Sequence, residues 1–217
     1  HLANFDEEHL ILTFSDEEVL WNKNSGISGR LWKPESGTIL AVSILDPNGR
    51  FWFGTLNQGL WTSSGQGEKT TPMNSYLNLT EDSQQDAMIL DLLIDSKLRL
   101  WVATYGKGVK QIDLLAKSLN PFSNTKQNPR SIRYNDILTI FEDYTGTLWF
   151  GSDGAGLSFY DAYLEKFNFF HNQELPENIN IDVVRAIYVD ENENVWLGTS
   201  GKGLTRFNPK TKTWKTF

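Results

Sequence analysis

Hydrophobic and polar positions near the end of the chain alternate in short blocks that do not fit a helical period. Residues 184–189 (VRAIYV) form an almost continuous apolar, β-branched run, which is typical of a strand covered on both faces. A polar turn (ENEN) follows, and then the segments VWLGTS, LTRFN and TKTWKTF, which are separated by turns containing glycine or proline. This pattern predicts a sheet of four short antiparallel strands.

The same blocks recur along the chain, and a tryptophan marks each copy. Successive marker tryptophans are 49, 48 and 47 residues apart. Each has an aspartate six positions before it, a tiny residue two positions after it, a small hydroxyl residue next, and a glycine seven positions after it followed by an aliphatic residue. The four pairs are Asp46 with Trp52, Asp95 with Trp101, Asp143 with Trp149, and Asp190 with Trp196.

Four antiparallel strands repeated about every 48 residues are typical of a β-propeller blade. The sequence therefore predicts an all-β fold in which the aspartates and tryptophans above are structural. A carboxylate before a tight turn can accept hydrogen bonds from the turn N–H groups and so close the first hairpin. The tiny residue is expected to let the indole of one blade lie close against the next sheet. This residue is Gly54, Ala103, Gly151 or Gly198.

The first forty residues contain a degenerate copy around Trp21, in which Leu31-Trp32 echoes Leu60-Trp61. We expect ILTFSDEEVLW to form the first hairpin of this unit and GRLWKP its third strand, with the outer strand missing or very short. The predicted domain is thus a single propeller or propeller fragment of four full blades and one degenerate blade. A complete five-bladed ring and an excised part of a larger ring both fit. The expected blades are residues 8–38, 39–87, 88–134, 135–181 and 182–217.

Composition narrows the possible partners. The 217 residues carry a formal charge of −7 at pH 7, with 27 acidic residues against 20 Lys and Arg. This balance argues against nucleic acid and against an anionic membrane surface as partners. The absence of cysteine from the sequence rules out disulfides, zinc-thiolate sites and thiol nucleophiles. No apolar run approaches the roughly 18 residues of a membrane-spanning helix, so no direct membrane insertion is expected in this region. The start at His1 predicts a processed or excised piece of a longer protein.

Two segments carry a family resemblance. VRAIYVDENENVWLGTSGKGLTRFNPKTKTW and ILTIFEDYTGTLWFGSDGAGLSFYD resemble the two-component regulator propeller repeat. The resemblance extends over residues 39–217, although the second copy departs from the pattern at Lys97-Leu98, Ala103 and Val109. It implies part of the periplasmic sensor region of a bacterial (hybrid) two-component sensor histidine kinase, an inner-membrane protein. It also implies signal transduction without catalysis in this region, because the kinase would lie elsewhere in the parent chain.

The residues offer little catalytic chemistry. The sequence has only three histidines, and His171 has no second histidine at the spacing of metal ligands. The glycines of residues 198–203 fail the spacing of a phosphate-binding loop, because Trp196 stands where the first glycine should be. We therefore expect no metal and no cofactor. An enzymatic interpretation, as a propeller lyase or hydrolase, would need a cluster of histidine and acidic residues that this sequence lacks.

Long connections predict where a ligand would bind. The turn between the second and third strands of a blade lies on the same face as the crossover to the next blade, and long loops on a rigid scaffold concentrate binding residues. The long crossovers are approximately residues 64–87, 123–135 and 171–181. The neighbouring turns offer amide, aromatic, acidic and amine groups that suit a sugar. The candidate ligand-binding residues are Asn57, Gln58, Tyr105, Lys107, Asp153, Ser200 and Lys202.

Two functional hypotheses follow from the sequence. In the first, the chain is an extracytoplasmic module that senses a small molecule, such as an oligosaccharide, and relays the signal to a partner. In the second, it is a non-catalytic scaffold whose rim or exposed sheet edge contacts another protein or another copy of itself. Binding of a solute would support the first hypothesis. Self-association or a protein partner, without any solute, would support the second.

Overall fold

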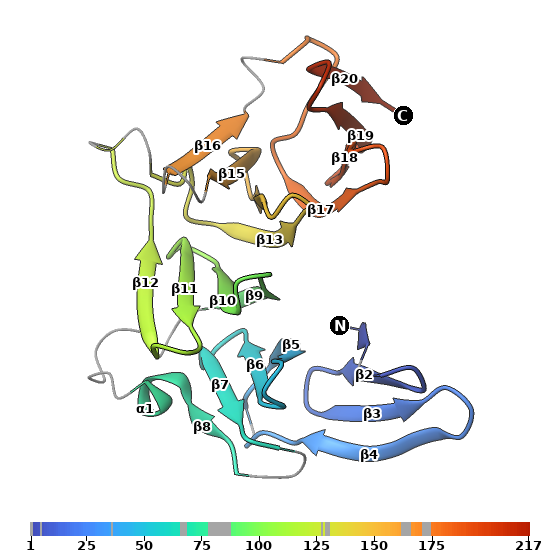
Figure 1. Ribbon diagram of the computed structural model, residues 1–217, viewed down its shortest axis with the longest axis vertical. Helices are drawn as coiled ribbons and strands as arrows, with labels where there is room; N and C mark the ends of the chain where they lie inside the picture. The colour runs from blue at the N-terminus through green and yellow to red at the C-terminus, as the bar shows by residue number, and fades with distance from the viewer. Residues whose placement is uncertain are drawn as a thin grey trace. The chain divides into compact units, whose positions relative to one another are not determined.

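The fold is all-β, as predicted from the repeats. The computed structural model describes residues 2–4, 6–35, 37–65, 69–77, 88–126, 128, 131–161, 166–170 and 175–217. The described residues form five four-stranded antiparallel sheets in chain order (Figure 1). The sheets are β1 (Leu2–Asn4), β2 (His9–Thr13), β3 (Glu18–Asn22) and β4 (Gly26–Trp32); β5 (Leu40–Leu45), β6 (Phe51–Thr55), β7 (Leu60–Ser63) and β8 (Thr71–Pro72), followed by helix α1 (Met73–Tyr76); β9 (Ile89–Ile94), β10 (Arg99–Thr104), β11 (Val109–Asp113) and β12 (Ser118–Phe122); β13 (Ile137–Glu142), β14 (Leu148–Ser152), β15 (Leu157–Asp161) and β16 (Lys166–Phe170); β17 (Val184–Val189), β18 (Val195–Thr199), β19 (Gly203–Asn208) and β20 (Thr213–Thr216).

The chain divides into two compact units. Unit 1 comprises residues 1–100 and 112–119, and unit 2 comprises residues 101–111 and 120–217. The division runs through the third sheet, so unit 1 contains the first two sheets and unit 2 the last two. The closure of a ring and the expected blade boundaries remain predictions.

The repeated aspartate ties the first hairpin of a sheet to the marker tryptophan. Asp143 Oδ1 accepts hydrogen bonds from the backbone N–H groups of Thr145 (2.9 Å) and Thr147 (3.1 Å), which closes the turn as the sequence predicts. Its other oxygen accepts a hydrogen bond from Trp149 Nε1 at 2.9 Å. The six-residue spacing thus places the indole beside the carboxylate. The same indole bond joins Trp52 to Asp46 at 3.1 Å and Trp196 to Asp190 at 2.8 Å.

The small hydroxyl residue and the glycine of each repeat close the second turn. The hydroxyl of Ser152 donates to the carbonyl of Gly156 at 2.8 Å. Gly156 has a φ of 75°, and a Cβ at this position would stand 2.6 Å from the carbonyl oxygen of Phe170. Glycine is required here both for the backbone conformation and for the close approach of the outer strand. The same bond is found in Thr55–Gly59 (2.8 Å), Thr104–Gly108 (2.7 Å) and Thr199–Gly203 (2.9 Å).

In two of the repeats, the tiny residue after the marker tryptophan makes room for the next sheet. A Cβ on Gly54 would lie 2.6 Å from Cγ2 of Ile89, on the first strand of the following sheet. A Cβ on Gly151 would lie 2.9 Å from Cγ1 of Val184, which has the equivalent position in the fifth sheet. Aliphatic side chains therefore set this contact.

Replacing Gly151 with alanine should lower the free energy of unfolding by about 1–2 kcal/mol, because the new methyl group overpacks the contact with Val184 and Thr139. The matched control is Gly198→Ala, where the nearest atom to a new Cβ is Ala186 Cβ at 3.3 Å and a smaller loss is expected. Chemical denaturation of both variants measures the difference. Equal losses would contradict the packing argument.

The first sheet differs from its predicted strand order. The sheet begins at β1, and its order is β1-β2-β3-β4. The turn between β2 and β3 holds Ser15, whose carbonyl accepts a hydrogen bond from the N–H of Leu40 at the start of β5. ILTFSDEEVLW therefore forms the second and third strands. The outer strand, which we expected to be missing or very short, is the seven-residue β4, and Trp21 lies on the third strand, 37% exposed.

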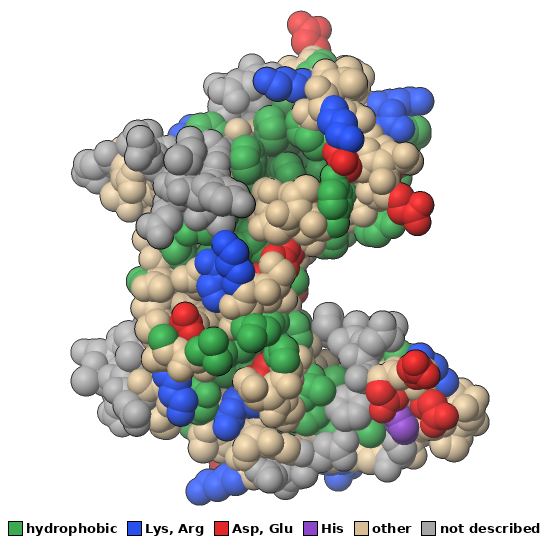
Figure 2. All heavy atoms as spheres, in the orientation of Figure 1, with side chains coloured by type: hydrophobic (Ala, Val, Ile, Leu, Met, Phe, Trp, Pro, Cys, Tyr) green, Lys and Arg blue, Asp and Glu red, His purple; other side chains and the backbone are tan. Residues whose placement is uncertain are grey.

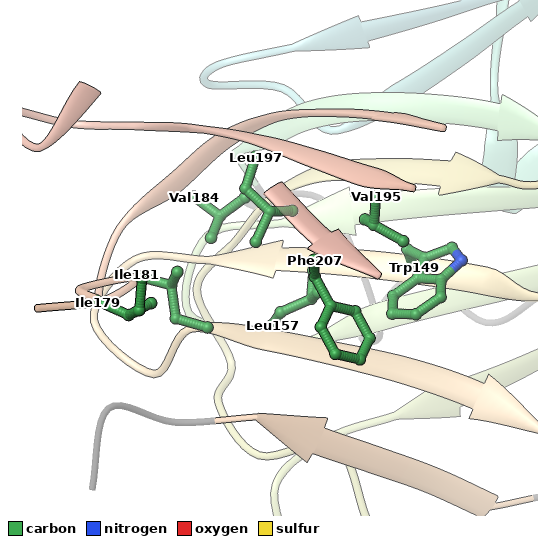
Figure 3. Close-up of a cluster of buried hydrophobic side chains, with 8 residues drawn as sticks. All are labelled: Trp149, Leu157, Ile179, Ile181, Val184, Val195, Leu197 and Phe207. Carbon is green, nitrogen blue, oxygen red and sulfur yellow. The ribbon is translucent and has the colours of Figure 1, made fainter. Parts of the chain in front are cut away.

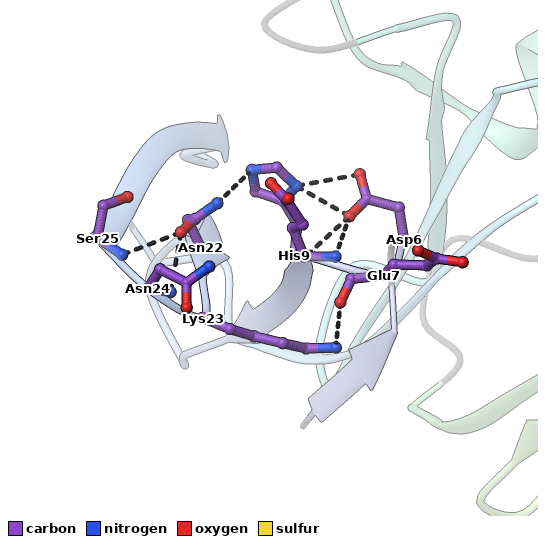
Figure 4. A network of polar contacts seen from close by, with 8 residues as sticks. Asp6, Glu7, His9, Asn22, Lys23, Asn24 and Ser25 are labelled. Atoms are coloured by element: carbon purple, nitrogen blue, oxygen red, sulfur yellow. Dashed lines mark hydrogen bonds and ion pairs between the residues drawn. The ribbon is translucent and has the colours of Figure 1, made fainter.

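A polar network joins the two turns at the other end of this sheet (Figure 4). His9 Nδ1 lies 2.9 Å from Asp6 Oδ1, and Asn22 Nδ2 lies 3.1 Å from His9 Nε2. Lys23 Nζ donates to the carbonyl of Glu7 at 2.8 Å. An Nδ1–H tautomer satisfies both ring nitrogens of His9. This histidine therefore has a structural role in the turns.

A buried carboxylic acid occupies the glycine position of the first sheet. Glu18 pairs with Thr13 across the hairpin, as Gly203 pairs with Thr199 in the fifth sheet, and its side chain is completely buried. Thr13 Oγ1 donates to Glu18 Oε1 at 3.0 Å, and Oε2 has no hydrogen-bond partner among the described residues. Burial raises the pKa of Glu18 to about 7. The acid is thus protonated in the folded state over part of the neutral range.

The core of unit 2 lies between the fourth and fifth sheets (Figure 3). Trp149 and Phe207 lie at one end of this buried cluster, and Ile179 and Ile181 from the crossover lie at the other. Between them, Leu157 of β15 and Val184 of β17 are completely buried. The strand β17, which we expected to be covered on both faces, is thus covered on the face that meets the preceding sheet, whereas Tyr188 on its other face is 59% exposed.

Candidate functional site

The second turn of a sheet and the crossovers share one end of the sheet, as expected. The N–H of Gly154 donates to the carbonyl of Asp182 at 2.7 Å, and the N–H of Gly108 donates to the carbonyl of Asn135 at 2.8 Å. We call this end of the sheets the crossover face. The opposite end, which carries the first and third hairpin turns of each sheet, is the turn face.

The seven predicted ligand-binding residues do not form one described site. Asn57 has a structural role, because its side chain accepts from the N–H of Ile39 (3.0 Å) and donates to the carbonyl of Gly37 (2.6 Å). Gln58 also belongs to unit 1 and is exposed. The other five residues belong to unit 2: Tyr105, Lys107, Ser200 and Lys202 are exposed, and Asp153 is half-buried and bridged to Val183.

Gln58 lines a groove on the crossover face of unit 1. The ring centroids of Trp32 and Trp61 are 6.0 Å apart, and those of Trp32 and Phe53 are 4.5 Å apart. Trp61 Nε1 donates to the carbonyl of Gln58 at 3.1 Å, which fixes the second indole. We name this 440 Å³ cavity the Trp32 groove; its lining is Trp32, Lys33, Pro34, Glu35, Thr38, Gln58, Trp61, Lys69, Thr70, Thr71 and Pro72.

A second, more polar groove lies on the crossover face of unit 2. The guanidinium of Arg133 lies 4.8 Å from the centroid of the Phe169 ring. Asn124 Nδ2 donates to the carbonyls of Ile132 (3.0 Å) and Arg133 (2.8 Å), which holds the crossover in a defined shape. This cavity of about 470 Å³ falls mainly in the predicted crossover of residues 123–135. The long connections thus do form grooves, although Ala155, and not Asp153, contributes from the adjoining turn.

A third cavity was not foreseen from the sequence, because it opens on the turn face. It has a volume of about 630 Å³ and lies between the fourth and fifth sheets of unit 2. Figure 2 shows hydrophobic side chains in a hollow over β15, β16, β19 and β20. Its aromatic residues looked like ordinary core in the sequence. We name it the turn-face pocket; it is lined by Asp143, Tyr144, Thr145, Thr147, Trp149, Phe159, Phe170, Leu175, Val189, Glu193, Val195, Phe207, Pro209, Lys212 and Trp214.

Charged and hydroxyl groups surround the mouth of this pocket. Glu193 accepts a hydrogen bond from Lys210 Nζ at 2.8 Å, and this contact and a hydrogen bond with Tyr144 hold the pKa of Glu193 below its usual value. The same bond with Glu193 raises the pKa of Tyr144 to about 12. In the adjoining turn, the indole of Trp196 and then the amide of Asn194 lower the pKa of Asp190 to about 2. Perturbed groups beside an apolar cavity are a common feature of binding sites.

Glu193 also has a strained backbone, with a φ of 68°. The equivalent position is Gly49 in the second sheet, Gly146 in the fourth sheet, and Leu98, with a φ of 60°, in the third sheet.

Replacing Leu98 with glycine should raise the free energy of unfolding by about 0.5–1 kcal/mol, because it relieves the left-handed conformation at an exposed turn. Glu193→Gly should gain less, because it also removes the contacts with Tyr144 and Lys210. Thermal denaturation of both variants tests this order, and an equal gain would show that these contacts contribute nothing to stability.

No metal centre emerges from the described part of the chain, where no three His, Cys, Asp or Glu side chains gather around a possible ion. His1 and His171 lie outside the described residues. In the described ranges, no helix has the length and apolar character needed to cross a bilayer.

Comparison with known protein families confirms the resemblance found in the repeats. Residues 131–154 and 178–201 match the family described as two component regulator propeller. These segments contain the first hairpins of the fourth and fifth sheets. No curated protein sequence matches the chain.

Solved structures share the fold at low sequence identity. The extracellular domain of a hybrid two-component system from B. thetaiotaomicron is 20% identical, with a TM-score of 0.72 over 99% of this chain and 29% of its own. PorZ, an essential surface component of the type-IX secretion system of Porphyromonas gingivalis, is 15% identical, with a TM-score of 0.72 over 100% of this chain and 33% of its own. Virginiamycin B lyase from Staphylococcus aureus, in an inactive form with quinupristin, is 12% identical, with a TM-score of 0.70 over 100% of this chain and 69% of its own. The chain spans about a third of the length of the first two proteins.

Proposed function

We propose that this chain is an extracytoplasmic sensing module of a bacterial two-component system, and that it binds an oligosaccharide on its crossover face. The match of two repeats to the regulator propeller family supports the signalling role. The similarity to an extracellular domain of a hybrid two-component system supports a location outside the cytoplasm, as the periplasmic part of an inner-membrane sensor. The same fold occurs in a lyase and in a secretion component, so the fold alone does not assign the role.

The Trp32 groove carries the proposal of a sugar ligand. Two partly exposed indoles offer flat apolar surfaces for the C–H face of a sugar ring. Gln58, Glu35 and Lys69 surround them with amide, carboxylate and amine groups that can hydrogen-bond to hydroxyls. A rigid aromatic platform with a polar rim suits an uncharged oligosaccharide better than a purely apolar solute.

A thermal-shift screen against a panel of oligosaccharides tests the sensing role. A ligand at about one hundred times its Kd should stabilise the chain by about 2.7 kcal/mol. For the sugar that gives the largest shift, titration calorimetry on Trp61→Ala should show binding at least about tenfold weaker. Lys202→Ala is the matched control, because this exposed residue of unit 2 lies outside the groove, and it should bind normally. A cooperative melt that no sugar shifts would contradict the proposal.

The exposed face of the fifth sheet favours a second candidate function, that of an interaction scaffold. Leu204 is 42% exposed, whereas Leu60 and Leu157 at the equivalent position are buried. Tyr188 and Phe217 are 59% and 56% exposed. A scaffold would contact a second sheet of this repeat type through these residues, and Leu204→Asp should then abolish self-association in sedimentation experiments. A chain that is monomeric at all accessible concentrations would contradict self-association.

A further inference from the structure

Two lysines have equivalent positions in the third and fifth sheets. Lys117 and Lys212 each stand sixteen positions after a marker tryptophan, in the turn before the outer strand. Both have a left-handed backbone, with φ of 52° and 55°. For each lysine, the relevant tryptophan is the marker of the preceding sheet. It is Trp52 for Lys117 and Trp149 for Lys212. The two junctions can be compared residue by residue.

In unit 1, the chain fills this place with an aromatic ring of its own. The ring of Tyr76, from helix α1, meets the indole of Trp52 edge-on, with centroids 5.4 Å apart and an interplanar angle of 88°. Lys117 Nζ lies 4.7 Å from the centroid of the Tyr76 ring, and Arg50 Cζ lies 4.5 Å from it. The tyrosine is thus bound by an edge-to-face contact and by two cation–π contacts.

In unit 2, the equivalent place is the turn-face pocket. Trp149 and Lys212 both line it, in the positions of Trp52 and Lys117. Phe170, Phe207 and Trp214 extend the aromatic wall, with 4.4 Å between the ring centroids of Phe207 and Trp214. The volume of about 630 Å³ lies within the usual range for small-molecule sites. A single six-membered ring fits it with room for substituents.

We propose that the turn-face pocket binds a small aromatic molecule whose ring lies beside Trp149 and Lys212 as Tyr76 lies beside Trp52 and Lys117. The cation selects an aromatic ring over a saturated one of the same size, because only the aromatic ring has a negative face. Hydroxyl groups of Thr145 and Thr147 and the carboxylate of Glu193 at the mouth can receive a polar substituent. This site is separate from the sugar groove of the proposed function, and neither ligand depends on the other.

The test uses p-cresol, which reproduces the tyrosine side chain, and 4-methylcyclohexanol as the saturated control. Calorimetric or NMR titration of the whole chain should show millimolar or tighter binding of p-cresol, as expected for eight heavy atoms. The saturated control should bind several times more weakly. Lys212→Met should weaken p-cresol binding about three- to tenfold, and Lys212→Arg should retain it. No binding up to the solubility limit, equal binding of the two compounds, or an unchanged Kd in Lys212→Met would overturn the proposal.

A second variant tests the equivalence of the two junctions. Tyr76→Ala removes the internal ring and should open a second site beside Trp52, so that two p-cresol molecules bind per chain. Added p-cresol should also raise the Tm of this variant more than that of the original chain. One bound molecule and equal Tm shifts would show that the two places are not equivalent and would overturn the argument from Tyr76. The Lys212 variants decide the main point even if Tyr76→Ala does not fold.

Discussion

Replacing Trp149 with alanine is expected to lower the free energy of unfolding by about 3–5 kcal/mol. The indole is 5% exposed, belongs to the core cluster of unit 2 and packs against Phe159 with ring centroids 5.3 Å apart. Its removal leaves a cavity and also takes the Nε1 donor from Asp143. Chemical denaturation monitored by circular dichroism measures the loss.

Two further variants separate the parts of this effect. Trp149→Phe retains an apolar ring but loses the bond to Asp143, and we expect a smaller loss of about 1–2 kcal/mol. Trp196→Ala should also cost less, because Trp196 is only half-buried and contacts Phe217 and Arg206 on one side. Melting of Trp149→Ala at the original temperature would disprove the role that we assign to the marker tryptophan.

Stability is expected to fall with rising pH through the titration of Glu18. Burial raises the pKa of this acid from 4.5 to about 7, so the folded state holds a proton that the unfolded chain releases. The resulting stabilisation is complete below about pH 4.5 and is lost as the pH rises through 7. The loss should amount to about 2–3 kcal/mol between pH 4 and pH 8.

Glu18→Gln isolates this contribution from the other titrating groups. The amide is nearly isosteric and cannot ionise, so the difference in the free energy of unfolding between the two proteins should change steadily from pH 4 to pH 8. The variant should gain in relative stability as the pH rises. A difference that is the same at every pH would show that the carboxyl of Glu18 has an ordinary pKa in the folded state.

The first sheet shows where the sequence pattern misled. Its second strand, HLILT, lacks the tryptophan and glycine that mark the other copies, so the sequence pattern points instead to Trp21 on the next strand. The sequence of a hairpin by itself does not show whether its strands are the first and second or the second and third of a sheet. The hydrogen bond from Leu40 to Ser15 and the pairing of β1 with β2 resolve this, because they show which end of the sheet meets the crossover.

The candidate sites were predictable only in part. The sequence correctly placed the second turns and the crossovers on one face, because strand alternation alone determines that geometry. It could not show that the side chain of Asn57 is engaged by the crossover, whereas Gln58 lies beside two indoles. The turn-face pocket was missed because Phe170 and Phe207 have the hydrophobicity expected of core, and a pattern of apolar residues does not reveal incomplete packing.

The sequence by itself determined the repeat, the four-stranded sheets and the aspartate–tryptophan hairpin, because these depend on contacts between residues a few positions apart. The tertiary structure decided which strand of the first sheet is outermost, why the glycine position can hold the buried Glu18, and where the cavities lie. Those features depend on contacts between neighbouring sheets, such as Gly54 with Ile89 and Tyr76 with Lys117. Side-chain volumes and directions across a sheet interface are set by partners distant in sequence, so only the folded chain reveals them.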